Sequence, residues 1–183
     1  KFEVKNDEEN TETEITIYGV IGESWFEDSF SASDIDRVLK NAGDNDVIIN
    51  LNSPGGDAFD GIAVYNRLKQ HKGKVTVYVH GWACSAASII AMAGDEVIMG
   101  LGSMMMIHEA STISWGSKGD MRKVADMLEQ LDNGIINIYE SRVAISREEI
   151  QEKLEAETWM SADTAVELGF ADKLANQNVS ETN

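Results

Sequence analysis

The chain has 183 residues, 43% of them hydrophobic and 26% charged, which is the balance of one globular domain with a sizeable core. Its formal net charge of −17 argues against nucleic acid or an anionic membrane as a partner, because both attract positive charge. Cys84 is the only cysteine, so we expect no internal disulfide and no cysteine-rich metal site, in keeping with a cytoplasmic protein. We find no apolar run of membrane-spanning length and no signal peptide, and we expect no membrane partner.

Strand and helix patterns alternate along the first hundred residues. Apolar runs bounded by turn residues predict strands, and apolar residues three or four positions apart predict helices. The alternation favours right-handed crossovers and the largely parallel sheet of an α/β protein, and the nearly continuous apolar run at residues 47–51 predicts a strand covered on both faces. The expected strands are residues 15–22, 47–51, 74–80, 96–99 and 103–108, and the expected helices between them are residues 33–43, 59–71 and 85–93.

Outside this alternation the patterns are more varied. Residues 1–14 are polar and acidic and predict a loosely held arm before a single domain at residues 15–175. A long amphipathic pattern at residues 120–143 predicts a helix whose apolar stripe packs on another subunit. The remaining expectations are an excursion at residues 109–118, a helix opened by the capping box at 146–149 and broken at 158–162, a helix at 162–168, a return to the sheet at 170–174 and a polar tail at 176–183.

Three separate stretches carry the residue types that acyl transfer needs, namely a nucleophile, a base and oxyanion donors. Ser85 lies where a strand meets a helix, and His108 ends a strand that can lie beside it. The amides of Gly56 and Ala86 can point into the same crevice at the carboxyl ends of the strands. Each feature also has an ordinary explanation: small residues let a helix pack closely on a sheet, and a single histidine is usually a satisfied core residue.

Taken together, the motifs resemble those of the ClpP-type self-compartmentalising serine peptidases. The resemblance covers roughly residues 15–174 and implies a ClpP/crotonase-like fold with βαβ repeats and a protruding strand–helix handle at residues 109–143. The matching motifs are Asn-Ser-Pro-Gly-Gly at residues 52–56, Gly-Trp-Ala-Cys-Ser at 81–85, Met-Ile-His at 106–108 and Ser-Ala-x-x-Ala-x-x-x-Gly at 161–169.

The resemblance also implies roles for individual residues. Ser85 is the expected nucleophile, His108 the general base, and the amides of Gly56 and Ala86 the oxyanion donors, with no metal and no organic cofactor. Laid on the family pattern without gaps, the chain has Lys153 where the acidic third member of the triad belongs, and a lysine cannot accept the imidazole N–H. Glu157, one turn further along the same predicted helix face, is the first candidate for the acid, and an ordinary solvated acidic face is the alternative.

The expected activity is that of a serine endopeptidase cutting peptide or protein substrates inside a homo-oligomeric chamber. The family forms heptameric rings that stack into tetradecamers, and a partner ATPase is left open because residues 1–14 do not resemble the family's docking loop. The small size and the Glu-Thr-Trp run at residues 157–159 resemble phage or prophage relatives associated with head maturation, which implies the bacterial cytoplasm or the prohead as the site of action. The alternatives are a crotonase-type acyl-CoA enzyme, which shares the fold, and a catalytically impaired ring or scaffold component.

Overall fold

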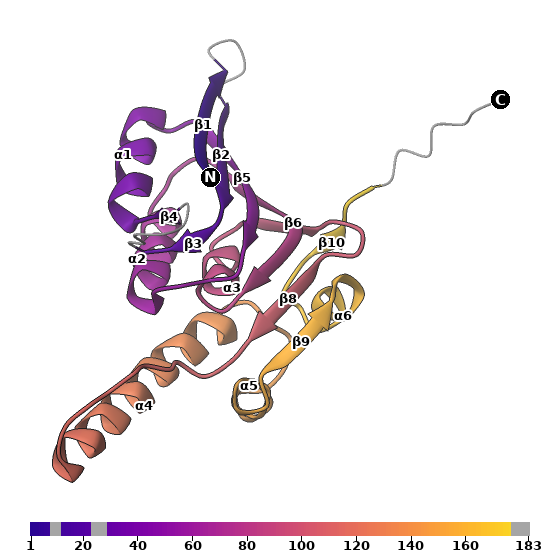
Figure 1. The fold of residues 1–183 in the computed structure, drawn as a ribbon. Helices are drawn as coiled ribbons and strands as arrows, with labels where there is room; N and C mark the ends of the chain where they lie inside the picture. Colours follow the sequence, from indigo (N-terminus) through magenta and orange to yellow (C-terminus); the bar gives the residue numbers. More distant parts are fainter. Residues whose placement is uncertain (8–11, 23–28, 177–183) are drawn as a thin grey trace.

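A computed structural model describes residues 1–7, 12–22 and 29–176, and Figure 1 shows how they are arranged. The strands of the main sheet are β1 (Phe2–Asp7), β2 (Glu12–Tyr18), β5 (Asp46–Ser53), β6 (Val75–Cys84), β7 (Glu96–Met99), β8 (Met104–Ile107), β9 (Thr158–Ser161) and β10 (Lys173–Leu174). Their main path is β1-β2-β5-β6-β7-β10, and β8 joins β6 and carries β9. Only the β1–β2 and β8–β9 pairs are antiparallel among the described strands of this sheet, which confirms the largely parallel α/β sheet.

The described part of the chain contains six helices in addition to the sheet. Figure 1 shows α1, α2 and α3 gathered beside β2, β5 and β6, while α4 extends away from the body of the molecule. A short second sheet pairs β3 (Val20–Ile21) with β4 (Ser29–Phe30). The helices are α1 (Ala32–Ala42), α2 (Ala58–Lys69), α3 (Ala86–Ala91), α4 (Lys118–Glu140), α5 (Arg147–Glu155) and α6 (Ala162–Glu167).

The pleat of β5 shows how the core is built. Val47, Ile49 and Leu51 are fully buried, whereas Ile48 and Asn50, which point to the other face, are half-buried. The prediction that this strand is covered on both faces is therefore wrong: one face carries the packed core, and the other remains partly open. Burial of each large aliphatic side chain on the packed face contributes about 1.5–3 kcal/mol.

The N-terminal residues differ from the arm expected from the sequence. Within the described part, β1 pairs with β2 along its whole length, from Phe2 opposite Ile17 to Asp7 opposite Glu12. The Phe2 ring stacks on the Phe30 ring with 5.7 Å between centroids. The polar and charged composition hid this edge strand, because an edge strand needs few buried side chains. Residues 8–11 of the predicted arm and 177–183 of the predicted tail lie outside the described residues.

The strand before the candidate nucleophile is longer than its predicted end at residue 80. β6 pairs with β7 up to Val79 and with β8 from Trp82 to Cys84, so it changes partner along its length. The same stretch of chain therefore serves both the main sheet and the β8–β9 extension. This change of partner places the end of β6 directly beside the end of β8, where His108 follows.

The predicted strand–helix handle is present in part: α4 is its helix, but residues 109–117 before it form no strand. Figure 1 shows residues 109–117 running alongside α4, which leaves the body of the molecule. Ile113 and Trp115 are almost completely exposed there. No described helix combines the length and the apolar composition needed to cross a membrane.

Candidate active site

Ser85 lies at the sharp bend between β6 and α3. Its backbone has φ 53° and ψ −123°, a conformation that L-residues rarely adopt. The bend is held by the hydrogen bond from the Ser85 amide to the Met106 carbonyl at 2.9 Å. Gly55 makes room beside it, because a Cβ at that position would lie 2.8 Å from Ser85 Cβ and 2.6 Å from the Cys84 carbonyl oxygen. The strain and the close packing fix where the Ser85 hydroxyl points.

The imidazole of His108 reaches that hydroxyl. His108 Nε2 lies 2.8 Å from Ser85 Oγ, so the two side chains predicted to converge from distant parts of the chain form a hydrogen bond. When the ring is neutral with its proton on Nδ1, Nε2 accepts this hydrogen bond and can take the serine proton. This is the geometry of a serine nucleophile with its base.

Cys84 is the neighbouring alternative nucleophile, and its surroundings disfavour it. The side chain is buried, and burial raises the pKa of the thiol to about 11. Because the thiolate is the reactive form, a thiol with this pKa stays protonated and inert near neutral pH. Ser85 is therefore the better candidate nucleophile of the two.

A buried hydrogen-bonded chain supports the nucleophile from behind. Ser88 Oγ donates to the Ser85 carbonyl oxygen at 2.6 Å and lies 2.7 Å from the Tyr139 hydroxyl. A serine hydroxyl has one proton, so Tyr139 must donate to Ser88. Burial raises the pKa of the Tyr139 hydroxyl, which keeps this donor protonated. The chain connects α4 to the bend that carries Ser85.

We expect Tyr139→Phe to lower both stability and catalysis, because Ser88 Oγ loses its donor in a buried site. The cost is about 1–2 kcal/mol, which for a domain of this size lowers the melting temperature by about 2–8 °C. Thermal denaturation and peptide turnover measure the two effects. Tyr65→Phe is the matched control, since its hydroxyl makes only an exposed 3.4 Å contact with Ser141 Oγ. Equal melting temperatures for the two variants would contradict the role of this chain.

Gly56 and Ala86 line the same cavity as Ser85 and His108. Ile21 bridges to the glycine loop through Gly55 O and Asp57 N, and no backbone hydrogen bond in the described part of the chain uses the Gly56 amide. As the first residue of α3, Ala86 has an amide with no acceptor within the helix. Both predicted oxyanion donors are therefore available to an incoming oxygen.

The cavity above Ser85 has a volume of about 450 Å³. Its lining includes Ser85 and His108 and a row of apolar side chains from α3 and α4, together with Phe59 of α2. The described residues that line it include no lysine and no arginine. The large aliphatic residues that α3 and α4 contribute to this row are Ile89, Met127, Leu128, Leu131 and Ile135.

The acid that would accompany His108 is not where the gapless comparison expects it. Lys153 belongs to α5, where its carbonyl accepts a hydrogen bond from Thr158 Oγ1 at 2.8 Å. The antiparallel β8–β9 ladder ends at Ile107 opposite Thr158, so His108 and Glu157 are the next residues at the same end of the ladder. The helix α5 ends at Glu155, so Glu157 lies outside the helix and not, as the sequence predicted, on the same helix face as Lys153.

The Glu157 side chain is exposed and points elsewhere in this structure. Its Oε1 accepts a 3.4 Å hydrogen bond from Trp159 Nε1, and within the described residues only Ser85 hydrogen-bonds to the His108 ring. Its backbone has φ 49°, and Ser85 is the only other described non-glycine residue with positive φ. Strain of this kind gathers at functional sites.

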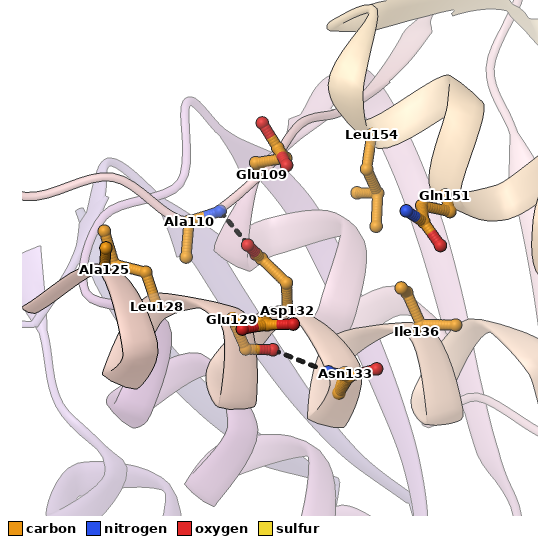
Figure 2. Close-up of a pocket in the computed structure, with 10 residues that line it drawn as sticks. All are labelled: Glu109, Ala110, Ala125, Leu128, Glu129, Asp132, Asn133, Ile136, Gln151 and Leu154. Atoms are coloured by element: carbon orange, nitrogen blue, oxygen red, sulfur yellow. Dashed lines mark hydrogen bonds between the residues drawn. The ribbon is translucent and has the colours of Figure 1, made fainter. Parts of the chain in front are cut away.

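A second carboxylate near the base was not predicted from the sequence. Asp132 of α4 accepts a 2.7 Å hydrogen bond from the Ala110 amide, two residues after His108. Figure 2 shows this contact among the residues that line a second cavity. That cavity has a volume of about 350 Å³. No local motif marks Asp132, because its partner lies 22 residues away across the fold.

Comparisons with known proteins indicate the family of the chain. The chain matches the Clp protease family over residues 12–178. It is 30% identical over 129 residues to an ATP-dependent Clp protease proteolytic subunit of Deinococcus radiodurans, covering 69% of this chain and 63% of that protein. It is 31% identical over 157 residues to ATP-dependent Clp protease proteolytic subunit 1 of Protochlamydia amoebophila, covering 81% of this chain and 76% of the relative.

A solved structure shares the fold. A point mutant of ClpP1 from Listeria monocytogenes superposes with a TM-score of 0.77, over 90% of this chain and 92% of the other, at 21% sequence identity. The matched region contains the whole of the site described above. The chain belongs to the Clp protease family.

Proposed function

We propose that the protein hydrolyses peptide bonds with Ser85 as the nucleophile and His108 as the general base. The observation that carries the proposal is the 2.8 Å hydrogen bond between Ser85 Oγ and His108 Nε2 in a cavity that can hold a peptide segment. A hydroxyl is a weak nucleophile unless a base removes its proton as it attacks, and the imidazole is placed to do so.

The reaction follows from this placement. Ser85 Oγ attacks the scissile carbonyl carbon while His108 Nε2 takes its proton, and the Gly56 and Ala86 amides hold the developing oxyanion. His108 then gives the proton to the leaving amine. The C–N bond breaks, the amine departs, and the acyl group remains on Ser85 as an ester. Water, deprotonated by His108, hydrolyses that ester and restores the serine.

Glu157 is the proposed orienting acid. It directly precedes β9 at the end of the β8–β9 ladder that His108 follows, and its carboxylate has to leave Trp159 to accept the Nδ1–H. An acid in this position fixes the neutral tautomer and stabilises the imidazolium formed during attack. The triad would then be complete only after a side-chain rotation.

The apolar side of the cavity favours substrates with an apolar side chain before the cleaved bond. The row of residues from α3 and α4 removes such a side chain from water, at about 25 cal/mol per Å² of apolar surface. The absence of lysine and arginine from the described cavity lining favours peptides over acyl-CoA, because CoA phosphates call for cations. A crotonase-type enzyme also has no use for a serine–histidine pair.

We further propose that the chain acts as a homo-oligomeric ring. The projecting α4 and the exposed Ile113 and Trp115 offer apolar surface that a monomer leaves in water. Heptameric rings, stacked tetradecamers and a chamber rest on the family resemblance, as does action in the bacterial cytoplasm or a phage prohead during head maturation. The same resemblance leaves an ATPase partner open.

A fluorophosphonate probe tests the activity. We expect the purified wild-type oligomer to be labelled, with the adduct mapped by mass spectrometry to Ser85, because only an activated serine attacks the phosphorus centre. Labelling at another residue would overturn the assignment of the nucleophile. Absence of labelling in a correctly folded oligomer would instead favour the impaired ring or scaffold component.

A further inference from the structure

The two amides that follow His108 are each held by a different helix. The Glu109 amide donates to the Leu154 carbonyl of α5 at 3.2 Å, and the Ala110 amide donates to Asp132 Oδ1 of α4 at 2.7 Å. Figure 2 shows Asp132 reaching from α4 to Ala110, with Leu154 in the same cavity. The segment that carries the base is therefore fixed from both helices.

Asp132 acts from outside the reaction cavity. It is half-buried and lines the 350 Å³ cavity of Figure 2, but it does not line the cavity that contains Ser85 and His108. Glu109 and Ala110 line both cavities, so the segment after His108 is part of the wall between them. A substrate bound over Ser85 has this wall between itself and Asp132.

The charge of Asp132 is coupled to the base. Burial raises the pKa of the Asp132 carboxyl, while the hydrogen bond from Ala110 and the positive charge of His108 act in the opposite direction. The other charged groups around the two cavities are also acidic, and no lysine or arginine lines either of them among the described residues. These groups are Asp57 of the α2 N-cap, Glu109 after β8 and Glu129 of α4. Glu157, which lines neither cavity, is a further acid at the end of the β8–β9 ladder that His108 follows.

We propose that Asp132 is a positioning residue for His108. Its carboxylate holds the Ala110 amide and thereby the segment that carries the imidazole, and its negative charge stabilises the imidazolium that forms when His108 takes the Ser85 proton. Asp132 differs from the other acids in being bonded to the main chain of that segment. The inference rests on the proposed serine-peptidase function.

Asp132→Asn separates charge from hydrogen bonding, because the amide oxygen still accepts from Ala110 while the negative charge is lost. The rate of fluorophosphonate labelling of Ser85 is measured against pH in assembled protein. We expect the maximal labelling rate to fall about tenfold, because the His108 imidazolium is less stabilised. For the same reason we expect the acidic limb of the pH–rate profile to move to lower pH by roughly half a unit. Asp126→Asn removes the same charge from an exposed position on α4 and is expected to follow the wild type.

Two further variants complete the test. Asp132→Ala removes the charge and the hydrogen-bond acceptor together. We expect Ser85 to be labelled more slowly in this variant than in Asp132→Asn, with the acidic limb of the pH–rate profile at a similar pH in both. Asp132→Glu retains the charge and is expected to keep the acidic limb of the wild type, whatever its maximal rate. If the asparagine variant does not assemble, Asp132→Ser supplies the neutral side chain.

A purely structural role predicts a lower maximal rate with an unmoved acidic limb. If the acidic limbs of the pH–rate profiles of Asp132→Asn and Asp126→Asn coincide, the inference is overturned, while the proposed peptidase function is unaffected. Absence of labelling at Ser85 in the wild-type protein would instead contradict the proposed function. Failure of the Asp132 inference and failure of the proposed function therefore give different results.

Discussion

Replacement of either Ser85 or His108 by alanine is expected to reduce peptide turnover by about 10⁵- to 10⁶-fold. The two side chains act in one proton-coupled attack across the 2.8 Å Oγ–Nε2 contact, so neither is useful without the other. The double variant should consequently be no slower than the single variants. A quenched fluorogenic peptide with an apolar residue before the cleaved bond gives the readout.

The control for this prediction is His71→Ala. His71 lies in the loop after α2, with its Nε2 2.7 Å from the Asn45 carbonyl, and its loss should leave turnover near that of the wild type. A Ser85→Ala protein that retains more than about 1% of wild-type turnover would place the nucleophile elsewhere. A loss of only tenfold in His108→Ala would reduce His108 to a packing role.

The Gly56→Ala variant is expected to have the second largest effect. A Cβ at position 56, where φ is 149°, would lie 2.0 Å from the Ile21 carbonyl oxygen and 2.8 Å from the Ile21 amide nitrogen. Real Cβ atoms do not approach backbone this closely, so the loop must move and the bridge to Ile21 must open. Displacement of one oxyanion donor costs about 10²–10³ in kcat, with KM little changed.

Gly134→Ala is the matched control for the glycine substitution. Gly134 lies within α4, and nothing is found within 4 Å of a Cβ added there. Alanine in a helix interior is more stable than glycine by about 0.5–1 kcal/mol, so this variant should melt no lower than the wild type. Unchanged kcat in Gly56→Ala would rule out the Gly56 amide as an oxyanion donor.

Much of the fold is visible in the sequence because it depends on periodic burial. The β–α alternation through residue 99 and the long α4 follow from patterns of spacing, and the structure confirms both. β1 and β9 escaped prediction for different reasons. β1 is an edge strand with little apolar content, and β9 has only four residues, placed directly after α5 and before α6.

The site residues differ in a similar way: some stand in local sequence motifs, and others are recognised only from the tertiary structure. Ser85, Gly56 and His108 stand in short motifs whose glycine, small-residue and strand contexts are readable along the chain. Glu157 lies outside α5, at the end of the β8–β9 ladder that His108 follows, and a gapless sequence comparison that selects Lys153 does not represent this strand pairing. Asp132 is found only from the folded chain, because nothing in its helix distinguishes it from the neighbouring surface acids.

The backbone at Ser85 has a consequence for the evolution of this protein. Glycine adopts φ 53°, ψ −123° freely, whereas a serine held there costs about 1–3 kcal/mol of folding free energy. The working enzyme is thus less stable at this bend than an inert glycine mutant would be. Selection for thermal stability alone should therefore favour replacement of Ser85 by glycine, which gives an inactive protein. A serine that is retained at this position indicates continuing selection for catalytic activity.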